Sequence, residues 1–179
     1  VPQDSSPLGV TGTTAGGTLS LINTFGTIPN VSPTGQYSGS VLSVLLKQVL
    51  SLMNANLGMR FFHLSTGGFD THSGQMVNNL HNLLLQDVND SLMAFYTDLL
   101  SLGMAQNTLI VVYSEFGRTV YSQGRLTADN YGRDHHPRNF CVWMAGGGIR
   151  GGVSHGATDD FSYNIVENPV HVHDLNATI

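Results

Sequence analysis

Three separated segments of this chain carry the residue types that bind metal ions in proteins. Asp70 and His72 lie two positions apart, Glu115 directly follows an apolar run, and Asp134 is adjacent to His135. Carboxylates and neutral imidazoles are ligands for zinc, manganese and magnesium, and a single pair of them binds a metal weakly. If the three segments meet, they could hold two cations about 4 Å apart and clamp the attacking and leaving oxygens of an ester.

Each of these features also has a purely structural explanation. An Asp-x-His sequence is commonly a turn aspartate followed by a surface histidine. Glu115 could cap a helix or pair with Arg118, and the polar loop around Asp134 and His135 could simply be solvated. The metal hypothesis therefore depends on the three segments converging, which requires specific elements between them.

Apolar residues recur at helical spacing in two regions. The first predicts a helix from residue 41 to about 55, ended by Gly58, and the second a helix from about 75 to 102, ended by Gly103. The stripe of the second helix consists of Val77, Leu80, Leu84, Val88, Leu92, Phe95 and Leu99.

Three apolar runs, at residues 59–65, 108–114 and 140–145, predict strands. The second is almost continuously apolar, which is typical of strands covered on both faces of a parallel sheet. Strand, helix and strand in this order indicate a right-handed crossover, so the sequence predicts an α/β domain with a mostly parallel sheet and flanking helices. Ligands of such sheets bind beyond the carboxyl ends of the strands, where the metal-binding segments would lie.

The composition excludes several classes of partner. Only 11% of the residues are charged, the net charge is −5 and Lys47 is the single lysine, which argues against nucleic acid or an anionic membrane. No apolar run is long enough to span a membrane. The low charge favours an exported protein, periplasmic or extracellular, whose signal peptide would lie upstream of Val1. Cys141 has no cysteine partner and lies in an apolar run, so we expect a buried thiol.

Residues 1–37 form a low-complexity lead-in, within which 19–28 could add a short strand, and residues 38–179 form the predicted domain. The glycines from Gly146 to Gly151 satisfy a dinucleotide-binding spacing, but no helix follows, so a tight turn is the better interpretation. Other histidines have structural explanations: His63 is expected to be packed and His81 to lie on a helix face. Asp174 suits the N-cap of a helix beginning at Leu175, although His171, His173 and Asp174 could also bind a metal.

Five motifs occur in an order that resembles a bacterial exported family, DUF1501, related to sulfatases and alkaline phosphatases. They are Gly68 to His72, Glu115 to Thr119, Gly132 to His135, Ala145 to Gly152 and Asp174 to Ile179. The resemblance implies a partial alkaline phosphatase/sulfatase-like layered fold. It also implies that Asp70 and His72 bind one metal, that Glu115 binds a second, and that Asp134 and His135 supply the later ligands. Arg118 has no fixed counterpart, and we expect it to contact an anion.

That superfamily also supplies an aspartate and a serine or threonine nucleophile from early strands. Residues 1–58 present no such pair, because Asp4 lies in the lead-in and no aspartate precedes a serine or threonine at a strand end. We therefore expect the nucleophile upstream of Val1 and a chain that is incomplete at both ends. The leading hypothesis is a metal-dependent hydrolase of small phosphate or sulfate esters, using zinc, with manganese, magnesium or calcium as alternatives. A second is a non-catalytic metal-binding module of the cell envelope. A third is a structural domain in which the acids and histidines are incidental.

Overall fold

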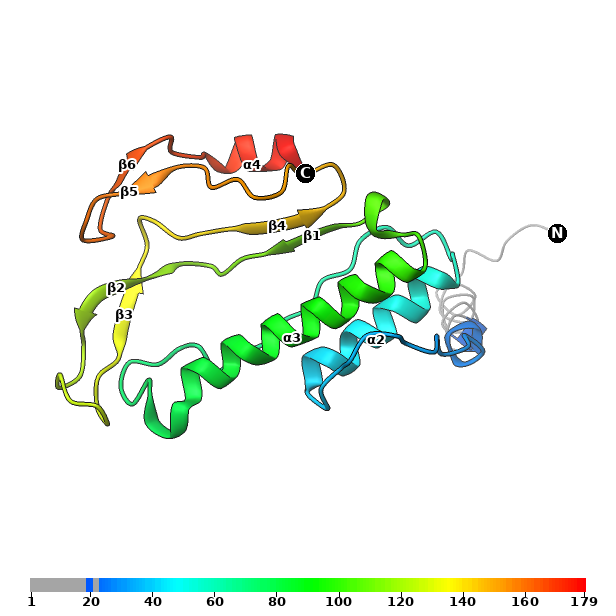
Figure 1. Cartoon of the computed structure of the whole chain (residues 1–179), viewed down its shortest axis with the longest axis horizontal. Helices are drawn as coiled ribbons and strands as arrows, with labels where there is room; N and C mark the ends of the chain where they lie inside the picture. The colour runs from blue at the N-terminus through cyan, green and yellow to red at the C-terminus, as the bar shows by residue number, and fades with distance from the viewer. Residues whose placement is uncertain (1–18, 21–22) are drawn as a thin grey trace, which may run out of the picture.

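The computed structural model describes residues 19–20 and 23–179 of the chain. Figure 1 shows a helical layer beneath a set of short strands. In chain order the elements are α2 Val41–Asn54, η1 Val77–Asn79, α3 Leu80–Ser101, η2 Ala105–Asn107, β1 Leu109–Val112, β2 Gly117–Ser122, β3 Arg133–His136, β4 Trp143–Gly146, β5 Ala157–Thr158, β6 Ile165–Glu167 and α4 Val172–Thr178. Of the predicted lead-in, residues 1–18 and 21–22 lie outside the described residues. The short strand predicted within 19–28 is wrong, because residues 23–26 are helical.

The helices α2 and α3 pack against each other and form the core. The side chain of Ser40 accepts a hydrogen bond from the Ser43 amide and so caps α2, whose predicted range is confirmed. The second helix begins later than predicted, at Leu80, because Asn78 and Asn79 have positive φ angles of 53° and 61°. The buried apolar cluster contains Leu42, Leu46, Val49, Leu50, Phe95, Leu99 and Ala105.

The predicted parallel sheet is wrong. The strands form three separate two-stranded antiparallel pairs, β1 with β4, β2 with β3, and β5 with β6. Residues 59–65 are extended but form no strand, so the predicted crossover unit has no parallel partner. The described residues therefore do not form an alkaline phosphatase-like layered fold. An apolar run indicates that a strand is at least partly covered, but it does not specify the direction of its partner.

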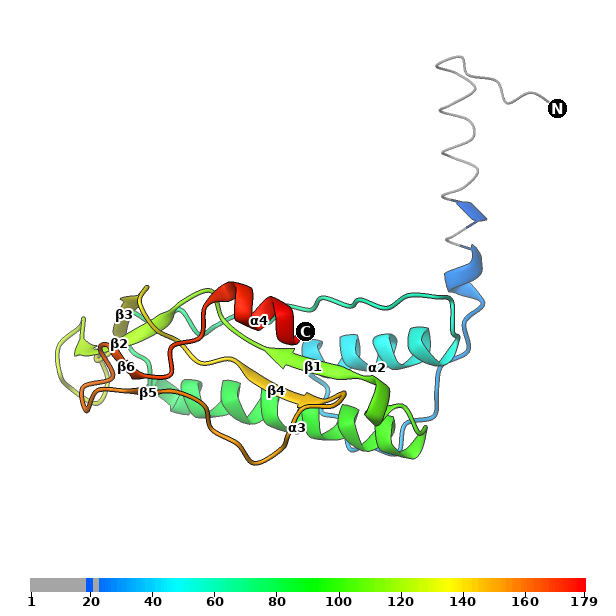
Figure 2. The same cartoon turned by 90° about the horizontal axis from the view of Figure 1, so that it is seen from above.

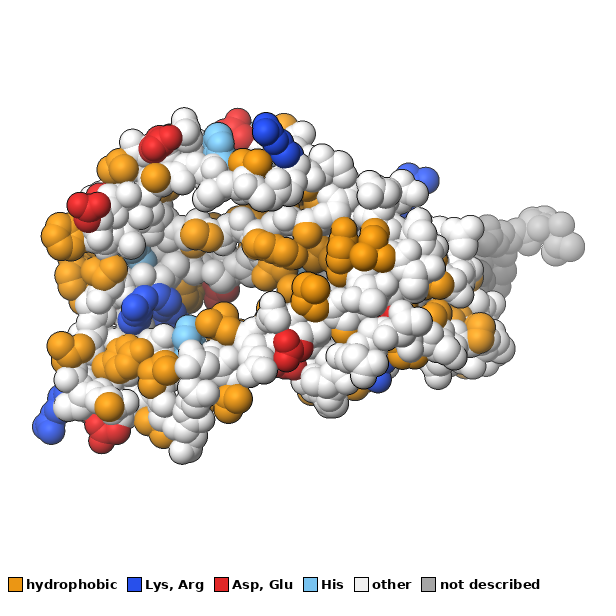
Figure 3. All heavy atoms as spheres, in the orientation of Figure 1, with side chains coloured by type: hydrophobic (Ala, Val, Ile, Leu, Met, Phe, Trp, Pro, Cys, Tyr) orange, Lys and Arg blue, Asp and Glu red, His pale blue; other side chains and the backbone are white. Residues whose placement is uncertain are grey.

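The β1/β4 pair is only partly covered. All four residues of β1 are half-buried, and Trp143 on β4 is 53% exposed. Figure 3 shows hydrophobic side chains at the surface in this view. Cys141, just before β4, is also exposed, so its predicted burial is wrong. The predicted glycine turn begins at the last residue of β4, with positive φ at Gly146, Gly147 and Gly148.

The extended segment 59–71 connects the two ends of the helical layer (Figures 1 and 2). Phe62 and Leu64 pack against the core cluster, which fixes the path of this segment along the helices. The segment ends near the beginning of α3, beside the β2/β3 hairpin (Figure 1). None of the helices in the described ranges combines the length and apolar character needed to cross a bilayer.

Candidate metal site

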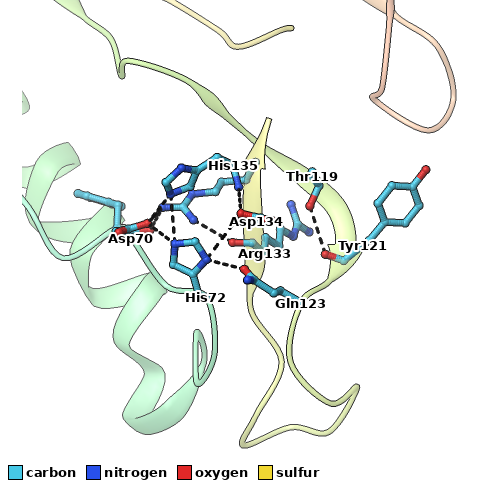
Figure 4. A network of polar contacts seen from close by, with 10 residues as sticks. Asp70, His72, Thr119, Tyr121, Gln123, Arg133, Asp134 and His135 are labelled. Carbon is cyan, nitrogen blue, oxygen red and sulfur yellow. Dashed lines mark hydrogen bonds and ion pairs between the residues drawn. The ribbon is translucent and has the colours of Figure 1, made fainter. Parts of the chain in front are cut away.

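Asp70, His72 and His135 converge beside the β2/β3 hairpin (Figure 4). The Oδ1 atom of Asp70 lies 2.9 Å from Nε2 of His72 and 2.9 Å from Nε2 of His135. The two Nε2 atoms are 3.1 Å apart. One carboxylate oxygen and two imidazole nitrogens therefore form a nearly equilateral triangle.

The backbone brings the two chain segments of this triangle together. The Thr71 amide donates to the Phe69 carbonyl at 2.9 Å, so the chain turns tightly at Asp70. The Arg133 amide then donates to the Thr71 carbonyl at 3.1 Å, which joins the turn to the start of β3. Asp70 and His72 thus face one another because the backbone turns between them.

Gly132 makes this close approach possible. A Cβ atom at this position would lie 2.3 Å from the carbonyl carbon of His72, closer than any side chain tolerates. The neighbouring Tyr131 carbonyl accepts a hydrogen bond of 3.0 Å from the Gln75 amide. The backbone that carries His72 therefore lies directly on a buried glycine.

Arg118 on β2 provides the positive charge of the site. Its Nη2 lies 2.5 Å from Oδ1 of Asp70. The same guanidinium donates to the carbonyl of Arg133 at 2.8 Å and to that of Phe69 at 3.3 Å. The hydrogen bond with His135 and then that with Arg118 lower the pKa of Asp70 to about 2, so this carboxylate is ionised under ordinary conditions.

Three further side chains orient the imidazoles. The side-chain oxygen of Gln123 contacts Nδ1 of His72, which leaves Nε2 of that ring facing the triangle (Figure 4). The ring of Phe116 stacks on that of His135 with the centroids 4.0 Å apart. Asp134 accepts a hydrogen bond of 2.7 Å from the His135 amide, and its Oδ1 lies 3.8 Å from Nδ1 of His72.

The geometry of the triangle suits a small divalent cation. Zinc with tetrahedral ligands at about 2.0–2.1 Å separates neighbouring donor atoms by roughly 3.3–3.4 Å. The donor atoms of Asp70, His72 and His135 would need to spread by less than about 0.5 Å to reach that separation. Nitrogen and oxygen ligands of this kind also fit manganese, whereas calcium and magnesium prefer oxygen alone.

The structure brings together some of the predicted ligands and not others. Asp70, His72 and His135 form the only group of three or more potential metal ligands within the described residues. Glu115 is exposed between β1 and β2 and is not part of this group. The Asp134 carboxylate lies at the edge of the site. It is near Nδ1 of His72 and accepts a hydrogen bond from the His135 amide, but it does not contact the Nε2 atoms of the triangle.

Sequence reasoning missed two participants. Gln123 carries no ionisable group and belongs to none of the motifs, so nothing in the sequence marks it. Gly132 lies within a recognised motif, but the need for a glycine arises only from the contact with His72. Arg118, for which an anion contact is predicted, donates to the Asp70 carboxylate and to two backbone carbonyls.

The histidine next to the triangle has a different environment. His136 is 2% exposed, and its Nε2 lies 2.9 Å from the Tyr163 carbonyl. Its Nδ1 accepts a 3.4 Å hydrogen bond from the Arg138 amide. A neutral ring with hydrogen on Nε2 satisfies both contacts, so His136 connects β3 to the segment before β6.

Comparison with known proteins identifies a family but no characterised relative. No curated protein matches the chain, and no solved structure matches it. Residues 35–179, which include every residue of the triangle, match the family model described as "Protein of unknown function (DUF1501)". The chain therefore belongs to the DUF1501 family.

Proposed function

We propose that Asp70, His72 and His135 bind one divalent metal ion, with zinc the best fit and manganese the closest alternative. The proposal is carried by the triangle of donor atoms, whose edges are 2.9, 2.9 and 3.1 Å. Three such ligands leave a tetrahedral ion with one free position, as in catalytic zinc sites. Structural zinc sites, in contrast, are closed by four protein ligands.

We further propose that this site serves a hydrolase of small phosphate or sulfate esters. A divalent cation bound there supplies a Lewis acid that polarises an ester oxygen. The exposed position of Asp70 and His135 leaves the site open to a substrate. Arg118 has five N–H groups, three of which have acceptors among the described residues, so two remain for an anionic substrate.

The second candidate function is a metal-binding module without catalysis. It is favoured by one observation: no serine or threonine hydroxyl hydrogen-bonds to Asp70, His72 or His135 in the described part of the chain. A nucleophile would then have to come from water or from outside these residues. For both candidates we propose an exported protein, on the grounds of its low charge and single lysine.

Two measurements test the metal site and the activity separately. Zinc affinity would be measured by titration calorimetry, and turnover with aryl phosphate and aryl sulfate esters in the presence of zinc or manganese. We expect Asp70→Ala and His135→Ala to abolish measurable zinc binding, while His155→Ala, which alters an exposed histidine outside the triangle, leaves it unchanged. Zinc binding that survives both triangle substitutions would refute the site. Zinc binding without turnover on either ester would favour the non-catalytic module.

A further inference from the structure

The Oδ1 atom of Asp70 is crowded. Three nitrogen atoms contact it: Nε2 of His72, Nε2 of His135 and Nη2 of Arg118. Arginine keeps its charge at every pH at which proteins are folded. A fixed positive charge therefore already contacts the oxygen that a metal ion would need.

Arg118 also joins the two segments that supply the donor atoms. Its Nη1 donates to the carbonyl of Arg133 on β3, and its Nη2 to the carbonyl of Phe69 in the turn. The Arg118 side chain is only 22% exposed, and its guanidinium carbon lies 5.6 Å from the centre of the Phe116 ring. This placement is well suited to holding the turn against the hairpin without any metal.

We propose that Arg118 is a built-in substitute cation, which keeps the site assembled in the metal-free protein and competes with the metal for Oδ1 of Asp70. This inference rests on the proposed metal site and adds a regulatory element to it. A divalent ion on the same oxygen would repel the guanidinium, since two positive charges would share one carboxylate. Metal affinity is therefore lower, and the metal-free site more ordered, than the three ligands alone would give.

The test compares two arginine substitutions in the full chain, with zinc as the titrant. Arg118→Gln removes the competing charge, and we expect zinc to bind about ten-fold more tightly. Arg125→Gln removes an equal charge from an exposed position in the loop between β2 and β3, and we expect wild-type affinity. Without zinc, Arg118→Gln should unfold at a lower temperature than wild type. Added zinc should raise the unfolding temperature of Arg118→Gln by more than that of wild type.

The outcomes separate this inference from the metal site itself. Equal or weaker zinc binding by Arg118→Gln would overturn the role of Arg118 alone. Absence of zinc binding by wild type and by every variant would overturn the metal site as well. If circular dichroism shows that Arg118→Gln does not fold, Arg118→Lys carries the test. Lysine keeps the competing charge but loses the paired carbonyl contacts, so we expect Arg118→Lys to bind zinc about as tightly as wild type while its metal-free form unfolds at a lower temperature. Zinc binding by Arg118→Lys that is clearly tighter than that of wild type would contradict the inference.

Discussion

The Nε2 atoms of His72 and His135 lie 3.1 Å apart, although 63 positions separate these residues in the chain. The Gln123 side-chain oxygen accepts a hydrogen bond from Nδ1 of His72, so a neutral His72 ring has its lone pair on Nε2, the atom that faces His135. Oδ1 of Asp70 lies 2.9 Å from each of them. This relationship places three potential metal donors together.

Gln123 should control zinc affinity without touching the metal. Its side-chain oxygen contacts Nδ1 of His72 and so directs Nε2 toward the triangle. Because partners that orient a ligand are typically worth 10- to 100-fold in metal affinity, we expect Gln123→Ala to weaken zinc binding by about that factor. Titration calorimetry checks this, with Gln86→Ala on the exposed surface of α3 as the control. Equal affinities for the two variants would show that Gln123 has no orienting role.

Gly132→Ala should damage both the stability and the site. The added Cβ would lie 2.3 Å from the carbonyl carbon of His72, so the turn that carries His72 must move away from β3. We expect a loss of about 1–3 kcal/mol in the free energy of unfolding, together with weaker zinc binding. Chemical denaturation measures the first effect. Gly151→Ala is the control, since nothing lies within 4 Å of its Cβ position, and a loss as large as that of Gly132→Ala there would remove the steric explanation.

Substitutions of the adjacent residues His135 and His136 should affect different properties: zinc affinity for His135 and folding stability for His136. His136→Phe keeps the aromatic ring but removes the hydrogen bond to the Tyr163 carbonyl, which should cost about 1–2 kcal/mol of stability. Zinc affinity of the folded variant should stay at the wild-type value. His135→Ala should lose zinc binding with little change in the stability of the metal-free protein, because its side chain is exposed. Zinc affinity lost equally in both variants would contradict this division.

Asp98 should make folding sensitive to acid. It is 1% exposed on α3, and its Oδ1 accepts hydrogen bonds from the Thr34 amide, the Thr34 hydroxyl and the Gly35 amide. Burial acts to raise the pKa of this carboxyl, but the hydrogen bonds from Gly35 and Thr34 outweigh burial and lower it. Asp98→Asn should therefore cost about 3 kcal/mol at neutral pH.

The sign of the pH effect follows from the lowered pKa. The unfolded chain takes up a proton near pH 4, whereas the folded protein resists protonation until lower pH. The stability contributed by Asp98 is therefore fully present above about pH 4 and is lost as the pH falls through the folded-state pKa. Urea denaturation measured from pH 6 downward should show that the free energy of unfolding falls more steeply with decreasing pH for wild type than for Asp98→Asn. Asp90→Asn, at an exposed position of the same helix, should follow wild type, and parallel curves for all three proteins would contradict the role of Asp98.

The loss of folding stability at high pH should depend on Tyr37. Burial raises the pKa of its hydroxyl, and the nearby Asp98 carboxylate raises it further. Since the unfolded chain loses this proton near pH 10 while the folded protein retains it, stability should fall above about pH 10. Tyr37→Phe cannot ionise, so its stability should be independent of this step. Thermal unfolding between pH 9 and pH 11 measures the stability of both proteins. An equal loss of stability in wild type and in Tyr37→Phe would exclude Tyr37 as the cause.

Part of the candidate site could be predicted from residue types alone. Asp70, His72 and His135 stand out because carboxylate and imidazole groups recur in loops between predicted elements. Glu115 stands out for the same reason, yet the structure does not bring it into the triangle. Residue type shows which side chains could bind a metal, but it does not show which of them meet.

Local sequence patterns were enough to predict α2, most of α3 and the glycine turn at the end of β4, because these features depend on residues close together in the chain. Its 3.6-residue periodicity specified α2 almost to the residue. The antiparallel pairing of β1 with β4 and the contact between the turn at Asp70 and Gly132 are visible in the folded protein but could not be predicted from these patterns. Hydrogen bonds between strands and contacts across a glycine join segments that are distant in the chain. The residue pattern of one segment does not specify which segment it will pair with or the direction of that partner.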